Sequence, residues 1–366
     1  MPRLIRILFA FLLVALSVPV RAEEPVQAPV FVSGEDGYHT YRIPSVIVSK
    51  KGTVLAFCEG RKSGRGDAGN IDLVLKRSTD NGKTWGKTQV VWDDAENTCG
   101  NACPVVDAKT GTIFLLLTHN FGRDGEAAIV SGKGKGSRTA WITSSTDDGG
   151  SWSKPDEITK DVKKPEWSWY ATGPGVGIQL ESGRLLIPCD SKSDGGKTRE
   201  SHVIFSDDAG KSWKIGGVVG PQCNESQAVE LPDGSVMLNM RSYQGNNRRL
   251  VAISKDGGVT FSKPVEDKAL IEPVCQASIL RLPGEGGGIL FSNPASMKRE
   301  KMTIRLSRDE GRTWSHAKEL HSGPAAYSCL IVLANGEIGC LYEHGSKNPY
   351  ETISFARFSR EWLTEK

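Results

Sequence analysis

Three arginines from distant parts of the chain have the chemistry of an anion-binding site. They are Arg42 in the segment YRIP, Arg241 in LNMRS and Arg299 in NPASMKRE. A guanidinium group binds a carboxylate in a planar, bidentate geometry and stays charged at any ordinary pH. If the fold brings the three side chains together, they predict a site for a ligand that carries a carboxylate.

A tyrosine and two acidic residues have the chemistry of bond cleavage beside such a carboxylate. Tyr327 lies in AAYSC, Glu225 in CNESQ and Asp67 in EGRKSGRGD. A carbon that bears a carboxylate repels an attacking aspartate or glutamate, but it does not repel a neutral tyrosine hydroxyl. Because the reference pKa of that hydroxyl is near ~10, it needs a general base. Glu225 is the predicted base, provided that it lies beside Tyr327.

Five copies of one turn, S-x-D-x-G-x-[TS]-[WF], divide the chain. The first serines of successive copies are 67, 61, 48 and 53 residues apart, which is typical of a repeat architecture. In each copy the carboxylate can accept backbone N–H groups and the glycine reaches positive φ without strain. The aromatic side chain can pack beneath the turn. The repeated aspartates are Asp80, Asp147, Asp208, Asp256 and Asp309.

A second series of turns alternates with the first, and each of its members reads as strand, tight turn, strand. Its turns fall at residues 51–52, 110–111, 182–183, 233–234, 284–288 and 335–336. Five times the hairpin is followed by a strand, an aspartate turn and another strand. The sixth hairpin lacks a fourth strand, which residues 28–33 are predicted to supply, closing the ring. The predicted fold is all-β, a single six-bladed β-propeller of four-stranded antiparallel blades over residues 23–366.

The order of the strands sorts the residues by face. Both kinds of turn fall at one end of the blades, so the repeated aspartates are predicted to stabilise turns rather than to transfer protons. Residues just before the first strand of a blade, or just after the second, fall at the other end and nearest the axis. Those predicted to gather there are Arg42, Arg61, Asp67, Asp190, Glu225, Arg241, Arg299, Tyr327 and Glu343.

These motifs resemble those of bacterial exo-sialidases (neuraminidases), six-bladed propellers with aspartate-box (BNR) repeats. YRIP, EGR, the five aspartate boxes, NE before VEL, NPxS and AYS occur in the family's order over about residues 30–360. The chain has Asn101-Ala102 where the family often has Asn-Pro. The aspartate boxes alone are weakly specific, whereas their combination with the other motifs is specific.

The resemblance implies roles in binding the substrate. Arg42, Arg241 and Arg299 would bind the carboxylate of a sialic acid. Glu343 would orient Arg42, and Arg61 would line the pocket near the 4-hydroxyl of the sugar.

The resemblance also implies catalytic roles. Tyr327 would be the nucleophile, Glu225 its general base, and Asp67 the general acid that protonates the leaving oxygen and later activates water. Asp72 is an alternative acid, but it falls within an apolar run that reads as a strand and is predicted to be structural. Glu126 would border the glycerol or N-acetyl pocket.

The activity implied is hydrolysis of terminal α-linked sialic acids from glycoproteins, glycolipids and oligosaccharides, with retention through a glycosyl-tyrosine intermediate. Three alternatives stay open: a trans-sialidase, a hydrolase for another nonulosonic acid, and a non-catalytic propeller that binds sialosides. A trans-sialidase and a hydrolase differ in pocket loops, which a sequence predicts poorly.

The first 22 residues are predicted to be a signal peptide that is cleaved after Ala22, because basic residues precede an apolar run too short to span a bilayer comfortably. The alternative is an uncleaved anchor. The protein is therefore expected to be secreted or periplasmic, with no transmembrane segment in the mature chain. The net charge of +3 belongs to three arginines of this leader, so nucleic acid is not a predicted partner.

No motif requires a metal ion or an organic cofactor. Cys99 and Cys103 are spaced like a loose pair of metal ligands, but no matching Cys/His pair accompanies them. The chain is too long to need a framework of disulfides.

Overall fold

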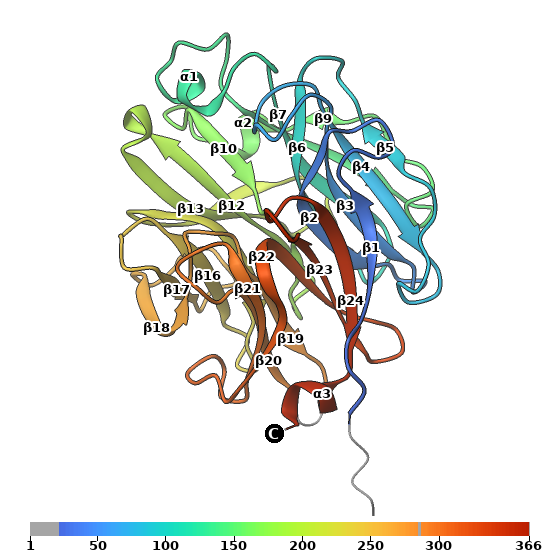
Figure 1. The fold of residues 1–366 in the computed structure, drawn as a ribbon. Helices are drawn as coiled ribbons and strands as arrows, with labels where there is room; N and C mark the ends of the chain where they lie inside the picture. The colour runs from blue at the N-terminus through green and yellow to red at the C-terminus, as the bar shows by residue number, and fades with distance from the viewer. Residues whose placement is uncertain (1–21, 285–286, 366) are drawn as a thin grey trace, which may run out of the picture.

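The computed structural model describes residues 22–284 and 287–365, and strands dominate it (Figure 1). Within those residues the strands form six four-stranded antiparallel blades around a central axis, which confirms the predicted propeller. The predicted signal peptide lies outside the described residues apart from Ala22 and stays a prediction. None of the helices in the described part of the chain is long and apolar enough to cross a membrane.

The first three blades follow one another along the chain. Blade one contains β2 (Thr40–Val48), β3 (Val54–Arg61), β4 (Ile71–Ser78) and β5 (Gln89–Trp92). Blade two contains β6 (Thr98–Val106), β7 (Ile113–Asn120), β8 (Thr139–Ser145) and β9 (Asp156–Glu157). Blade three contains β10 (Trp169–Thr172) and β11 (Ile178–Gln179), which share the inner position, then β12 (Leu185–Ser193), β13 (Thr198–Ser206) and β14 (Lys214–Val219).

The last three blades complete the ring. Blade four contains β15 (Cys223–Glu230), β16 (Val236–Ser242), β17 (Arg248–Ser254) and β18 (Val265–Ile271). Blade five contains β19 (Ser278–Leu282), β20 (Gly288–Pro294), β21 (Glu300–Ser307) and the first half of β22 (His316–Val332). Blade six contains the second half of β22, then β23 (Ile338–His344), β24 (Thr352–Phe358) and β1 (Val26–Val32). The short helices are α1 (Glu126–Val130), α2 (Thr159–Val162), η1 (Asp194–Gly196) and α3 (Arg360–Thr364).

The ring closes where the two ends of the chain meet. β1 pairs antiparallel with β24, in a register that places Val26 opposite Arg357 and Val32 opposite Thr352. Figure 1 shows β1, in blue, beside the red strand β24. The prediction that residues 28–33 supply the missing strand is therefore confirmed. This closure hides the edge that an open ring of blades would expose.

Hydrogen bonds between different blades connect the inner strands at the centre of the ring. The Gln276 side chain donates to the backbone oxygen of Ser328 at 2.9 Å and accepts from its N–H at 3.0 Å. Ser45 Oγ donates to the backbone oxygen of Gly175 at 2.7 Å, which joins blade one to blade three. These polar groups buried along the axis are thus satisfied by other blades, which helps to hold the inner strands in place.

The aspartate turns lie at the end of the blades predicted from strand order. In each of the five blades that contain such a turn, the first serine of the turn lies opposite a residue next to the hairpin turn. Ser78, for example, pairs with Val54, whereas Arg61 lies at the far end of the same strand pair. The hairpin turn at 284–288 includes residues 285–286, which lie outside the described residues.

The first aspartate turn shows why its sequence is repeated. Asp80 Oδ1 accepts from Ser78 Oγ at 2.6 Å and from the N–H of Thr84 at 2.9 Å, and Asp80 Oδ2 accepts from the Thr84 hydroxyl at 2.6 Å. Gly82 has φ of 78°, and a Cβ on it would lie 2.3 Å from the ring of Phe355 in blade six. Each turn thus fixes its own backbone and packs against a neighbouring blade.

We expect Asp80→Ala to lower the melting temperature by roughly 1–4 °C, because the turn loses its acceptor. Differential scanning calorimetry measures the change. Asp156→Ala is the matched control, since Asp156 is exposed in β9, and it should melt like the unmodified protein. An unchanged melting temperature for Asp80→Ala would contradict the structural role of the aspartate.

Candidate active site

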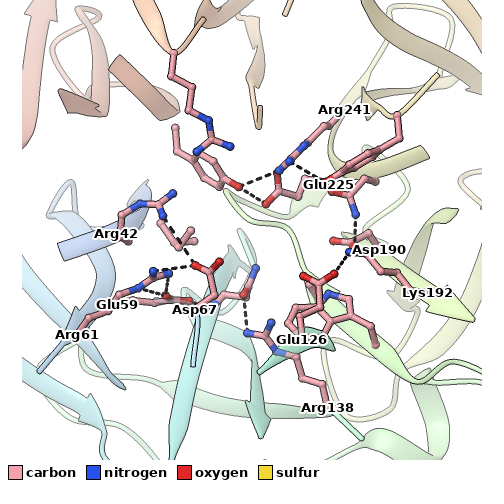
Figure 2. Close-up of a pocket in the computed structure, with 18 residues that line it drawn as sticks. Arg42, Glu59, Arg61, Asp67, Glu126, Arg138, Asp190, Lys192, Glu225 and Arg241 are labelled. Carbon is pink, nitrogen blue, oxygen red and sulfur yellow. Dashed lines mark hydrogen bonds and ion pairs between the residues drawn. The ribbon is translucent and has the colours of Figure 1, made fainter. Parts of the chain in front are cut away.

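One cavity opens at the end of the axis opposite the aspartate turns (Figure 2). The empty space in it is about 720 Å³, with the open mouth included. Every predicted member of the site lines it except Glu343, which lies behind the wall. The lining residues are Arg42, Ile43, Glu59, Arg61, Asp67, Asn101, Glu126, Arg138, Trp169, Ala171, Asp190, Lys192, Asn224, Glu225, Arg241, Tyr243, Arg299 and Tyr327.

Irregular pairing of inner strands coincides with the site residues. The antiparallel register shifts within residues 42–45 of β2, 223–226 of β15 and 325–328 of β22. Such bulges bend a strand and re-aim its side chains, and they are frequent beside active sites. Glu225 and Tyr327 lie inside two of these bulges. The bulges therefore explain how residues of inner strands point into the cavity instead of packing between blades.

Glu343 connects one arginine to the bulge that carries Tyr327. Its fully buried carboxylate accepts from Arg42 Nε and from the N–H of Ile43, both at 2.8 Å, and from the N–H of Tyr327 at 3.1 Å. Ile43 has φ of 62°, a strained value for a β-branched residue, which these bonds help to hold. Burial disfavours the charge of Arg42, but Glu343, together with Tyr327 and Tyr350, outweighs burial and raises the pKa of the guanidinium.

Arg241 and Arg299 are held by groups at the sides of the cavity. Arg241 donates to Glu225 Oε2 at 2.6 Å and to the hydroxyl of Tyr243 at 2.8 Å. Arg299 donates to the hydroxyl of Tyr350 at 2.7 Å. Arg241 Nε has no hydrogen-bond partner within residues 22–284 and 287–365. That nitrogen is buried, whereas Arg299 uses only one of its nitrogen atoms in a hydrogen bond within the described residues and keeps donor groups for an incoming anion.

Tyr327 and Glu225 meet at the foot of the arginines. The Tyr327 hydroxyl donates to Glu225 Oε1 at 2.5 Å and accepts from Arg241 at 3.2 Å. The guanidinium carbon atoms of Arg42 and Arg299 lie 5.2 Å and 5.5 Å from the centre of the tyrosine ring. Burial, and next the charge of Glu225, raise the pKa of Tyr327 well above its ordinary value. The phenol is therefore neutral and hydrogen-bonded to its predicted base.

Asp67 lies at the mouth of the cavity, on the loop between β3 and β4. Its side chain is 70% exposed, and its Oδ1 lies 2.8 Å from Arg61 and 3.9 Å from Arg42. Partial desolvation opposes ionisation, but the two arginines outweigh it and lower the pKa of Asp67. Arg61 is fixed from below by two bonds to the buried carboxylate of Glu59, at 2.6 Å and 3.0 Å.

Asp72, the alternative acid, does not line the cavity. It lies in β4, where its carboxylate accepts from Tyr38 at 2.7 Å and pairs with Lys62 at 3.0 Å. This position agrees with the structural role predicted for it.

The wall opposite Arg42 and Arg241 carries further charges (Figure 2). Arg138 is almost fully buried, donates to Asn101 Oδ1 at 2.8 Å, and stacks 4.4 Å from the ring centre of Trp169. Lys192 forms an ion pair with Glu126. Glu126, predicted at the border of the pocket, therefore lies on this far wall.

Several residues of the site were missed by sequence reasoning, and two of them had a detectable signal. Tyr243 follows Arg241 by two residues, and Lys192 follows Asp190 by two, a spacing that places side chains on one face of a strand. Arg138 directly precedes the third strand of its blade, a position that the search of first and second strands omitted. Tyr350 lies two residues before β24, and no sequence pattern indicated that it belongs to the site.

Comparisons with known proteins place this geometry in context. Residues 52–340 match a family model described as a BNR repeat-like domain. A sialidase of Micromonospora viridifaciens is 36% identical over 91% of this chain and 53% of its own length, and one of Bacteroides fragilis is 35% identical over 85% and 61%. The chain thus spans between half and two thirds of these relatives. A solved Hadza microbial sialidase, Hz136, aligns with a TM-score of 0.83 at 30% identity, covering 91% of this chain and 68% of its own.

We expect Glu343→Ala to lower the free energy of unfolding by about 3–5 kcal/mol, because it leaves the buried charge of Arg42 without its partner. Urea unfolding measures the change. Glu319→Ala removes an exposed glutamate of β22 and should stay within about 0.5 kcal/mol of the unmodified protein. Equal effects of the two substitutions would contradict the role given to Glu343.

Proposed function

Because the chain belongs to the sialidase family, we propose that it is an exo-sialidase that hydrolyses terminal α-linked sialic acids of glycoconjugates. One observation carries the proposal: the Tyr327 hydroxyl lies 2.5 Å from Glu225, at the foot of three arginines. Most glycosidases cleave their substrates with a pair of carboxylates. A tyrosine nucleophile is the exception found in sialidases, and it fits a substrate that carries its own carboxylate.

In this mechanism Arg42, Arg241 and Arg299 bind the carboxylate on the anomeric carbon. The anion pairs with their remaining donors, and this fixes the anomeric carbon near Tyr327. The arginines also attract an anionic substrate into the cavity. Binding energy is thereby used to position the reacting carbon for attack.

Tyr327 attacks the anomeric carbon while its proton passes to Glu225. The raised pKa of Tyr327 means that a free phenolate is not formed in advance, so attack and proton transfer must be coupled. The bond to Glu225 Oε1 supplies the path for the proton. Attack forms a bond between Tyr327 and the sugar and breaks the glycosidic bond; water then replaces the tyrosine with net retention.

Asp67 protonates the leaving oxygen and later takes a proton from water. Before substrate binds, Arg61 and Arg42 hold this carboxyl in its ionised form. A bound carboxylate neutralises Arg42, and the sugar displaces water from the exposed side chain. Both changes raise the pKa of Asp67 and favour the protonated form that an acid needs.

The decisive experiment compares a fluorogenic sialoside with an analogue in which the carboxylate is reduced to an alcohol. The proposal predicts release of the fluorophore from the sialoside and at least a roughly hundredfold lower kcat/KM for the analogue, because the arginines lose their ligand. Equal cleavage of both compounds, or cleavage of neither, would reject the proposal.

We expect Tyr327→Phe to reduce kcat by about 10³-fold or more, since the nucleophile is removed while the ring still packs between Arg42 and Arg299. Turnover of an aryl sialoside measures the loss, and the melting temperature confirms that the variant folds. Near-normal turnover by a folded Tyr327→Phe would exclude this tyrosine as the nucleophile.

We expect Asp67→Ala to reduce kcat about 10²–10⁴-fold on sialyl-oligosaccharides and much less on aryl sialosides, whose leaving groups need little protonation. Parallel kinetics on sialyllactose and a nitrophenyl sialoside give the comparison. Losses of the same size on both substrates would argue against an acid role for Asp67.

A further inference from the structure

Asp190 is a buried carboxyl group in the cavity wall to which the proposed mechanism gives no role. It lies on β12, is 1% exposed, and faces Ala171 of β10 on one side and Ser201 of β13 on the other. Its Oδ1 accepts from Asn224 Nδ2 at 2.7 Å, and Asn224 directly precedes Glu225 (Figure 2). Asp190 is thus connected to the strand that carries the predicted base.

The surroundings of Asp190 contain no cation that pairs with it. Within residues 22–284 and 287–365 it forms no ion pair, because Lys192, two residues away on β12, is paired with Glu126 of α1 instead. Its second oxygen has no hydrogen-bond partner among those residues, although the side chain lines the cavity. A buried, ionised carboxylate without a cation beside it is unfavourable in free energy, and protonation is the usual way to remove that cost.

We propose that Asp190 is a positioning residue that works as a neutral carboxylic acid. Its Oδ1 holds Asn224, its Oδ2–H points a donor into the cavity, and its neutrality keeps a second negative charge away from Glu225. The consequence for catalysis rests on the proposed sialidase activity; the protonation state does not.

The charged and titratable neighbours of Asp190 support this assignment. Burial, and next the charge of Glu225 on β15, raise the pKa of Asp190 to about 8. Glu126 of α1 acts in the same direction, while Lys192 and Arg138 oppose it. The remaining titratable neighbours, which stay neutral near pH 7 because their pKa values are raised, are Tyr170 of β10, Cys189 of β12 and Tyr243 after β16.

The geometry predicts what happens when the proton is lost. Above about pH 8 the ionised Asp190 adds a negative charge to a cavity that binds a carboxylate, so KM should rise. The ionised form also lacks the O–H donor. Asparagine reproduces the neutral acid at every pH, because its oxygen can accept from Asn224 and its amide can donate into the cavity.

The kinetic test compares the unmodified protein with Asp190→Asn on an aryl sialoside, which depends little on the protonation of Asp67. Asp190→Asn should retain kcat/KM within about threefold at pH 6 and should lack the KM increase, about tenfold between pH 7 and 9, of the unmodified protein. Asp156→Asn makes the same substitution at an exposed site and should keep the unmodified profile. The same alkaline increase in Asp190→Asn, or a loss above about tenfold at pH 6, would overturn the proposal.

A spectroscopic test needs no activity. The infrared difference between the unmodified protein and Asp190→Asn should show the carbonyl band of one protonated carboxyl group at pH 7. The same band should disappear from the unmodified protein as pH rises through about 8. Absence of the band at pH 7 would overturn the proposal. If the protein cleaves no sialoside, the proposed function fails, and this measurement still decides whether Asp190 carries its proton.

Discussion

The constraint on which the structure depends is the convergence of three like charges. Arg42, Arg241 and Arg299 surround one tyrosine ring, and guanidinium groups so close together repel one another. Glu343 compensates part of that charge from behind the cavity wall, through Arg42, and Glu225, which lines the cavity, compensates another part through Arg241. Tyrosine hydroxyls hold two of the arginines without neutralising them. The compensation is therefore incomplete on the open side, where the carboxylate of the proposed substrate would supply the rest.

The propeller meets this constraint by placing the stabilising turns at one end of the blades and the candidate site at the other. The arginines come from blades one, four and five, and only a closed ring brings those strands to one axis. The aspartate turns fix five of the six blades at the opposite end, where each carboxylate accepts bonds from its own turn, as Asp80 does. The site end can then tolerate bulges and the strained backbone of Ile43, because the other end and the axis hold the strands in place.

This separation also explains how much the sequence predicts. The fold follows from the regular alternation of two turns, and the side chains at the centre of the cavity follow from strand order, since both are local patterns repeated around the ring. Glu343 was predicted because it lies near the end of the second strand of its blade, β23. Arg138 and Tyr350 were not, because both lie on loops, where Arg138 bonds to Asn101 of its own blade and Tyr350 to Arg299 of the adjacent blade. The sequence also does not show which charged residues pair with each other. Nothing in it indicates that Lys192 forms its ion pair with Glu126 rather than with Asp190.

The carboxyl groups of the cavity show that residue type does not fix charge. Asp67 is exposed beside two arginines, so it is ionised until a ligand competes for them. Glu225 shares its two oxygens between Arg241 and the Tyr327 hydroxyl, which keeps an acceptor directed at the proton to be moved. Asp190 has only the neutral side-chain amide of Asn224 as a hydrogen-bond partner, so it keeps its proton. The arginines are distributed unevenly, so the three carboxyl groups of one cavity can have different roles: Asp67 the proposed acid, Glu225 the proposed base and Asp190 the neutral donor. In the proposed mechanism, ligand binding changes the protonation of Asp67, the one that faces solvent.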